Sequence, residues 1–456
     1  MNQHDDDFFV KRSVSQKEVG KSEKRDAENS SKKTGAQSSR RISPDAKKIP
    51  EKGQIMPEAA EQGKNGAVTA GKNEGKLKFL KIPEAYKSGN VDMVFLVILL
   101  MLLAFGAVMS FSASYAYAST KYGDSYYFLW RQLLYTFVGM VAILMVTLIP
   151  LKYYRVGTYF IFGVAIILLL LVLFIGTERG GAKRWLEIPG LGSFQPSELA
   201  KTALVMMIAM YMAKFGDEVQ SKSWKKAVPY GLIFPGLIIL LIGGLVVAEK
   251  HFSGLVILCC IGFSVMVLGG SKLRYIVPIG IIAVVAIGAM IVFTDYSSTR
   301  IEVWLDPWTD PTGSGWQTIQ GLYTIASGGI FGVGLGNSRQ KFGYVAEPQN
   351  DFIFTIVCEE LGFIGAMAVM ALFFLLIWRG FVIARHSPNR FTYLIVMGLM
   401  VKVALQVGFN IAVVTNSIPN TGISLPFFSS GGTSLVVQMA EMGIVLSISR
   451  YSHNKK

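Results

Sequence analysis

The sequence predicts an all-α, polytopic integral membrane protein with about ten transmembrane helices and a large folded extracellular loop. Only 16% of its 456 residues are charged and its mean hydropathy is +0.44, whereas a soluble domain carries about 25% charged residues. Long apolar runs recur along the chain, and the basic residues fall in an N-terminal tail and in alternate connections between those runs. Together these observations place the chain in the membrane class.

A spanning helix needs about 20 predominantly apolar residues. Runs of that kind lie near 91–114, 128–149, 156–175, 197–213, 230–248, 252–270, 275–294, 351–377, 391–415 and 431–449. The fourth run is the weakest of them, because Glu198 and Lys201 lie near its start.

The basic residues predict the orientation of these spans. With the N-terminus in the cytoplasm, the cytoplasmic connections and the C-terminal end hold Lys152, Arg155, Lys214, Lys222, Lys225, Lys226, Lys272, Arg274, Arg379, Arg385, Arg390, Arg450, Lys455 and Lys456. Most of the opposite loops hold fewer for their length, as the positive-inside rule requires, although 176–196 is unusually basic. We therefore expect an inner-membrane protein whose two termini are both cytoplasmic.

The chain divides into four predicted parts. Residues 1–78 carry 17 Lys and Arg against 12 Asp and Glu with few apolar residues, so we expect a disordered cytoplasmic tail. Residues 79–90 form a juxtamembrane segment, 91–450 the membrane domain, and 451–456 a second cytoplasmic tail. The net charge of +14 serves orientation rather than nucleic-acid binding, and no nucleic-acid partner is expected.

Two predicted outer loops stand out, at 176–196 and at 295–350. The second is far longer than a helix connection requires, and its three tryptophans and several glycines are not low-complexity sequence. Loops of this length are usually functional or disordered. We expect this one to be folded.

The segment WLDPWTDPTGSGWQ at 304–317 displays Asp306 and Asp310 on a shaped turn. Each aspartate precedes a proline, which fixes its own φ and extends the preceding residue. Turn formation alone could explain the pattern, and catalysis is the alternative. The sequence contains no nucleotide-binding fingerprint, which favours a substrate that is already in the membrane or outside.

Other polar features have both structural and functional readings. The glycine-rich stretch 326–338 lacks the lysine of a P-loop, which favours a structural role over phosphate binding. Lys402 and Glu441 lie well inside predicted spans, where a charge is costly, so we expect them to be buried and paired. The four histidines and three cysteines are scattered and show no metal-ligand spacing.

Five stretches in family order resemble the SEDS family (shape, elongation, division and sporulation proteins, including FtsW, RodA and SpoVE), which are peptidoglycan glycosyltransferases. The matching stretches are GGAKRWLEIPGLGSFQPSELAK (180–201), DPWTDPTGSGWQ (306–317), GGIFGVGLGNSRQKFGYVAEPQNDFIF (328–354), EELGFIGA (359–366) and IPNTGISLPFFSSGGTS (418–434). The closing stretch is most similar to the FtsW and SpoVE division and sporulation branch.

The resemblance implies polymerisation of lipid II into β-1,4 glycan, with inversion at the donor sugar and release of undecaprenyl pyrophosphate. It places the catalytic base on Asp310, with Asp306 as the fallback. Nearby cations are expected to hold this carboxylate ionised, and partial burial to raise its pKa. Substrate-binding roles fall on Arg184, Lys183, Lys201, Gln195, Glu198, Asp306, Gln317 and Glu360.

The resemblance also implies partners: lipid II and the nascent glycan, a class B penicillin-binding protein that acts as transpeptidase, and other divisome proteins. Arg184, Lys201 or a divalent cation, Mg²⁺ or Mn²⁺, could stabilise the leaving pyrophosphate; no other cofactor is expected. Two other function classes stay open from the sequence, namely a lipid II flippase and a non-enzymatic division scaffold.

Overall fold

A computed structural model of the chain describes residues 89–179, 182–188, 192–292 and 301–452. The predicted tail 1–78, nearly all of the segment 79–90 and the last four residues lie outside that range. The helices in the ten predicted apolar runs are α1 (Met93–Tyr122), α2 (Tyr127–Leu148), α3 (Tyr154–Ile175), α4 (Pro196–Lys214), α7 (Phe234–Ala248, which continues a helical stretch from Trp224), α8 (Phe252–Leu268), α9 (Leu273–Val292), α12 (Ile353–Arg385), α13 (Arg390–Val414) and α14 (Thr433–Ser449).

Each of the predicted apolar runs therefore contains a helix, which confirms the all-α membrane architecture. Six helical stretches of the described chain are both long and apolar enough to cross a membrane by themselves, while α8, α9 and α14 are shorter apolar helices. Helix α4 is not among these, because the buried charges of Glu198 and Lys201 lower its hydropathy. Its place is in the interior of the bundle, where these charges find partners.

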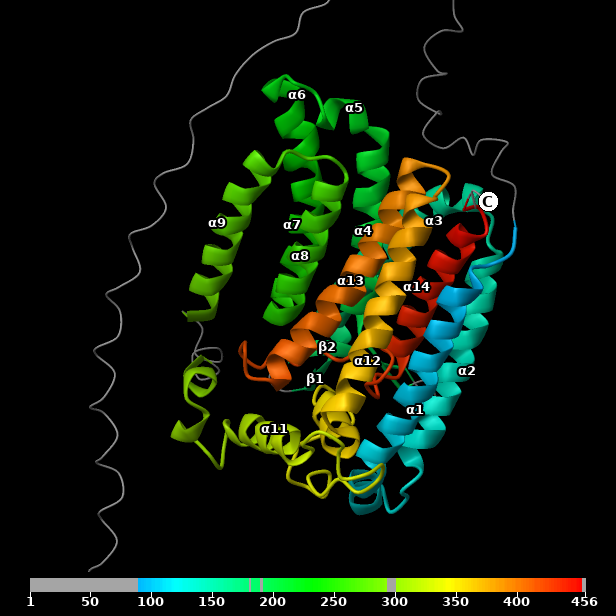
Figure 1. Cartoon of the computed structure of the whole chain (residues 1–456). Helices are drawn as coiled ribbons and strands as arrows, with labels where there is room; N and C mark the ends of the chain where they lie inside the picture. The colour runs from blue at the N-terminus through cyan, green and yellow to red at the C-terminus, as the bar shows by residue number, and fades with distance from the viewer. Residues whose placement is uncertain (1–88, 180–181, 189–191, 293–300, 453–456) are drawn as a thin grey trace, which may run out of the picture. The chain divides into compact units, whose positions relative to one another are not determined.

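The short elements complete the chain. They are η2 (Leu151–Tyr153), β1 (Thr177–Arg179), β2 (Ala182–Ile188), β3 (Gly192–Phe194), α5 (Gly216–Val219), α6 (Trp224–Val228), η3 (Pro229–Ile233), η4 (Pro307–Thr309) and α11 (Trp316–Ser327). The basic loop after α3 forms a small antiparallel sheet in the order β1-β2-β3. Figure 1 shows this sheet and α11 towards one end of the bundle, while α5, α6 and the end of α14 lie at the opposite end.

Local sequence explains where several helices begin and end. Asp92 caps α1 by accepting a hydrogen bond from the Phe95 amide at 2.9 Å, and Arg379 of α12 pairs with the same carboxylate at 2.8 Å. Pro196 starts α4 at a position where the missing N–H costs nothing. Helix α12 is kinked at Gly362, whose φ of 68° only glycine adopts readily.

The interior of the bundle is built around α13. In the most apolar 18-residue stretch of α13, 61% of the residues are buried. The corresponding share is 22% for α2 and for α3. Helix α2 packs on α14 where Gly139 faces Met439 and Gly443 lies against Ile143. Small residues at such a crossing let two helices approach closely in a membrane.

Candidate active site

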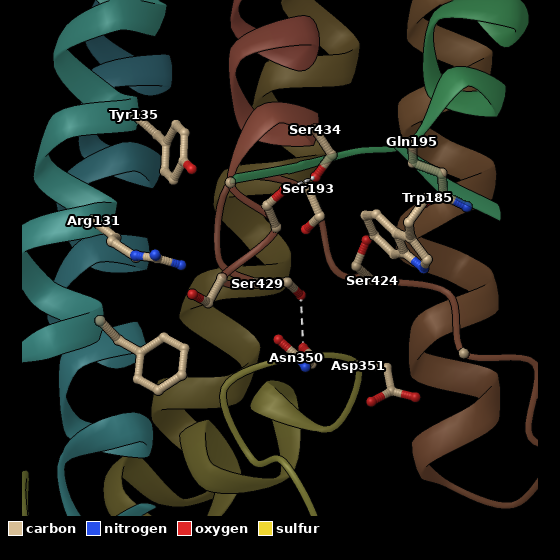
Figure 2. A pocket seen from close by; sticks show the side chains of 15 residues that line it. Arg131, Tyr135, Trp185, Ser193, Gln195, Asn350, Asp351, Ser424, Ser429 and Ser434 are labelled. Carbon is tan, nitrogen blue, oxygen red and sulfur yellow. Dashed lines mark hydrogen bonds between the residues drawn. The ribbon is translucent and has the colours of Figure 1, made fainter. Parts of the chain in front are cut away.

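A polar cavity of about 300 Å³ lies where α2, the β2–β3 hairpin, the start of α4 and two loops converge. Figure 2 shows the side chains around it. Its lining residues are Phe128, Arg131, Tyr135, Trp185, Ser193, Gln195, Asn350, Asp351, Gly422, Ser424, Ser429, Ser430, Gly431, Gly432 and Ser434. The lining residues extend from Phe128 to Ser434, more than 300 residues apart in sequence, so only the fold assembles the cavity.

Arg131 of α2 is the basic residue among the described residues that line this cavity. Its guanidinium lies 4.6 Å from the centroid of the Tyr127 ring, a cation–π contact that orients the side chain. The Ser-Ser-Gly-Gly turn at 429–432 and the first turn of α14 line the same cavity. Helix α14 begins there without a side-chain cap, so its amino end adds partial positive charge.

Hydrogen bonds to backbone carbonyls fix the serine-rich turn. The Ser430 amide donates to the Gln349 carbonyl at 2.8 Å, and the Ser429 hydroxyl donates to the Asn350 carbonyl at 2.7 Å. The Thr433 hydroxyl donates to the Ser193 carbonyl at 2.8 Å, which joins α14 to the hairpin. The wall of the cavity is thus held in place before any ligand binds.

Of the residues predicted to bind substrate, Gln195 lines the cavity. Arg184 and Lys183 do not line it. Arg184 donates from Nη2 to the Lys250 carbonyl at 2.8 Å, and its neighbour Trp185 lines the cavity. Successive side chains of a strand point to opposite faces, which explains why Arg184 is directed towards the α7–α8 connection.

Lys201 and Glu198 form a buried ion pair of 2.7 Å in α4. Lys402 of α13 lies 4.0 Å from the second oxygen of Glu198 and pairs with Glu441 of α14. The Thr202 hydroxyl also donates to Glu441. The expectation that Lys402 and Glu441 are buried and paired is confirmed, and the four charges of this network balance.

Asp310 lies on a half-exposed turn that is not part of the cavity wall. Its carboxylate accepts hydrogen bonds from the Ser314 amide at 2.7 Å, the Ser314 hydroxyl at 2.8 Å and the Gly313 amide at 3.0 Å. These bonds, those from Ser314 first, lower the pKa of Asp310 below its ordinary value, and desolvation opposes them more weakly. Burial thus raises the pKa, as expected, but the neighbouring donors outweigh it and the net shift is downward.

The rest of that loop is tied to the segment after α13. The Trp304 indole donates to the Asn416 carbonyl at 3.1 Å, and the Asn420 amide lies 3.5 Å from the Gln317 side-chain oxygen. Asp306 caps the 3₁₀ turn η4 by accepting from the Trp308 amide at 3.0 Å. The segment after Asn420 continues into the cavity wall at Gly422, so these contacts connect the Asp310 loop to the cavity rim.

Glu360 is buried on α12 and does not line the cavity. It pairs with Lys341 at 3.0 Å and accepts from the Ser112 hydroxyl of α1 at 2.7 Å. The glycine-rich stretch packs beside it, with the Gly334 amide donating to the Glu360 carbonyl at 3.0 Å. This arrangement supports the structural reading of that stretch.

Sequence reasoning missed Arg131 and Lys341. Arg131 lies near the start of an apolar run. A single arginine at the membrane interface is common there, so its position alone does not indicate a functional role. Lys341 lies within a stretch that matches the family, but its burial depends on Glu360 of α12 and on Ser112 of α1, which is 229 residues away in sequence.

Comparisons with known proteins agree with this architecture. The family model of the FtsW/RodA/SpoVE cell cycle proteins matches residues 92–454. Stage V sporulation protein E of Bacillus subtilis (strain 168) is 36% identical over 368 residues, which cover 80% of this chain and 99% of that protein. A probable peptidoglycan glycosyltransferase FtsW of Trichlorobacter lovleyi is 36% identical over 375 residues, covering 82% of this chain and 96% of the relative.

Solved structures show the same fold. A chain from a study of polymerization and crosslinking by a peptidoglycan synthase complex superposes with a TM-score of 0.65 at 27% identity, covering 79% of this chain and 98% of that one. The rod shape determining protein RodA of Thermus thermophilus superposes with a TM-score of 0.59 at 24% identity, covering 80% and 98%. The chain described here belongs to the FtsW/RodA/SpoVE family of cell cycle proteins.

Proposed function

We propose that this protein is a peptidoglycan glycosyltransferase that polymerises lipid II into β-1,4 glycan at the outer face of the bacterial cytoplasmic membrane. The observation that carries the proposal is the polar cavity with Arg131 on one side and the serine-glycine turn and α14 amino end on another. A guanidinium that shares a cavity with the amino end of a helix suits the pyrophosphate of a lipid-linked sugar. The relatives named as peptidoglycan glycosyltransferases support the reaction.

In the proposed reaction, Asp310 accepts the proton of the acceptor sugar's 4-hydroxyl. That oxygen forms the new bond to C1 of the donor sugar while the bond from C1 to the pyrophosphate oxygen breaks on the opposite face, which inverts the configuration. The Asp310 carboxylate is ionised at neutral pH, as an ordinary aspartate is, and the hydrogen bonds from Ser314 and Gly313 lower its pKa further. Arg131 and the amino end of α14 stabilise the charge that develops on the leaving pyrophosphate.

The side chains of the described residues do not provide an evident binding site for a divalent cation. Residues 89–179, 182–188, 192–292 and 301–452 contain no group of three or more His, Cys, Asp or Glu side chains that could hold one. Arg131, which lines the cavity, is the proposed partner of the pyrophosphate. A requirement for Mg²⁺ or Mn²⁺ would point to binding through the substrate's own phosphates.

The relatives also suggest the cellular setting. One structural relative is a chain of a peptidoglycan synthase complex that coordinates polymerization with crosslinking. We propose a class B penicillin-binding protein as the transpeptidase partner, with other divisome proteins, lipid II and nascent glycan as further partners. The FtsW relatives favour a role in cell division.

The proposed orientation puts both termini in the cytoplasm and 295–350 outside. Reporter fusions test this orientation at Ser223, in the connection before α6, and at Ser314, in the loop before α11. Figure 1 shows α6 and α11 at opposite ends of the bundle. We expect a cytoplasmic signal at Ser223 and an external one at Ser314. The reverse result would exclude this orientation and, with it, external glycan synthesis on this loop.

Arg131→Ala should reduce use of lipid II more than Arg184→Ala does. Arg131 lines the cavity, whereas Arg184 is engaged with the Lys250 carbonyl. Loss of a charge-assisted contact costs about 1.5–3 kcal/mol, or roughly 10- to 150-fold in kcat/KM. Arg131→Lys should restore only part of the activity, because lysine lacks the planar fork.

Steady-state polymerisation by the purified protein measures this comparison. A larger loss of kcat/KM in Arg184→Ala than in Arg131→Ala would instead assign the pyrophosphate site to Arg184 on strand β2. Gel analysis of the same reaction distinguishes a glycosyltransferase from the two alternative functions, because a flippase or a scaffold forms no glycan. The cognate transpeptidase is included in each reaction.

A further inference from the structure

The segment between α9 and α12 carries a patch of exposed apolar side chains, which we call the loop apolar patch. It consists of Leu305, Trp308, Leu322, Tyr323, Ile330, Phe331, Val333 and Leu335, all exposed. Phe331 is 80% exposed, the largest fraction among these residues. Exposed apolar side chains that accumulate on one segment in this way indicate an interaction site.

The composition of this segment is that of a lipid-facing surface. No Asp, Glu, Lys or Arg occurs from Pro311 to Ser338, a stretch of 28 residues, where a soluble protein would carry about seven charges. Helix α11 buries Thr318, Gln320 and Thr324 together with Ile319, and exposes Leu322 and Tyr323. A helix that faces water shows the opposite arrangement, with its polar face outward.

The patch is continuous with the exposed side of α12. The Phe363 amide donates to the Gly329 carbonyl at 2.9 Å, and the Ile364 amide donates to the Ile330 carbonyl at 3.2 Å. Phe363 and Ile364 are themselves 63% and 52% exposed on a helix long and apolar enough to span the membrane. Ile330 and Phe331 therefore extend the membrane-facing surface of α12 onto the loop.

The backbone holds this arrangement rigidly. A Cβ on Gly328 would meet the Cys358 carbonyl, and one on Gly332, at a φ of 80°, would meet the Glu360 carbonyl. Both glycines permit the loop to lie directly on the α12 backbone at its kink. The exposed side chains thus have a fixed position relative to the membrane-spanning helix.

We infer that the loop apolar patch is seated in the lipid leaflet at the α11 end of the bundle, the outer leaflet in the proposed orientation. Trp308 and Tyr323, whose ring centroids lie 6.0 Å apart, would then stand at the headgroup level, where such aromatic side chains concentrate. Because Asp310 follows Trp308 by two residues, this seating holds the Asp310 turn at the depth of a lipid-linked pyrophosphate. The inference goes beyond the proposed function, and only this last consequence depends on it.

Thiol accessibility in a bilayer tests the inference independently of activity. Phe331→Cys is compared with Arg339→Cys, an exposed position just beyond the uncharged stretch, in the full chain reconstituted in phosphatidylethanolamine–phosphatidylglycerol nanodiscs. The unsubstituted protein gives the background, since Cys358 is buried and Cys259 and Cys260 are half-buried. Polyethylene-glycol maleimide should label Phe331→Cys at least about tenfold more slowly, since such apolar faces lie about 5–10 Å below the bilayer surface.

Ile330→Cys, also at an exposed position, should show the same protection from labelling. This second variant tests whether the protection is a property of the patch and not of one substitution. Equal labelling of the patch positions and Arg339→Cys would overturn the inference. Protection that appears only when a single-pass transpeptidase is added to the nanodiscs would also overturn it, because the patch would then be a protein-docking surface. Labelling of all variants in SDS confirms that each thiol is present.

Discussion

Asp310→Asn is expected to lower lipid II polymerisation by about 10²–10⁴-fold, the usual contribution of a positioned general base. The amide keeps the size of the side chain and removes its ability to accept a proton. It also loses one oxygen acceptor for the Ser314 amide and hydroxyl, both of which bind Oδ2. The measurement is initial rate with purified protein and its transpeptidase, with membrane insertion checked separately.

Two control variants separate chemistry from the shape of the turn. Ser314→Ala removes one hydroxyl donor but leaves the Asp310 carboxylate and the two backbone donors, so it should retain most of the activity. Asp306→Asn keeps an oxygen that can accept from the Trp308 amide and should behave similarly. If Asp306→Asn is inactive and Asp310→Asn is active, the catalytic base is Asp306. If both variants are active, a carboxylate base on this loop is excluded.

Lys402→Met is expected to destabilise the protein by about 3–5 kcal/mol, because it leaves a buried carboxylate without its partner. Lys402 and Glu441 are 0% and 1% exposed, and Glu441 receives its charged hydrogen bond from Lys402. With Lys201 still balancing Glu198, the substitution leaves one net negative charge in the bundle. Unfolding by SDS titration in mixed micelles measures the free energy change.

The double variant Lys402→Met/Glu441→Gln tests the cause of that loss. It restores electroneutrality while leaving Thr202 a side-chain partner on α14. We expect it to recover a large part of the stability lost in Lys402→Met. No recovery in the double variant would mean that packing of the lysine stem, rather than the buried charge, determines the loss.

Several site assignments were accessible from the sequence because local motifs carry them. The Asp-Pro steps around Asp306 and Asp310 predict a turn, and the structure gives each carboxylate a capping role in that turn. The charges of Lys402 and Glu441 inside apolar runs predict burial and pairing, since isolated charges in a membrane are costly. The small sheet after α3 was not predicted, because its short strands lie in a loop without a clear alternating pattern.

The sequence by itself determined that this is a membrane-embedded helical protein of a recognisable family, because hydropathy and short motifs are local properties of the chain. Only the tertiary structure decided which side chains share a site. It brought Arg131 and Gln195 to one cavity and turned Arg184 away from it, although Arg184 lies in a matching motif. It also joined Ser112 to Glu360, 248 residues apart. Such contacts depend on how helices pack and on which face of a strand is covered, and neither is written in local composition.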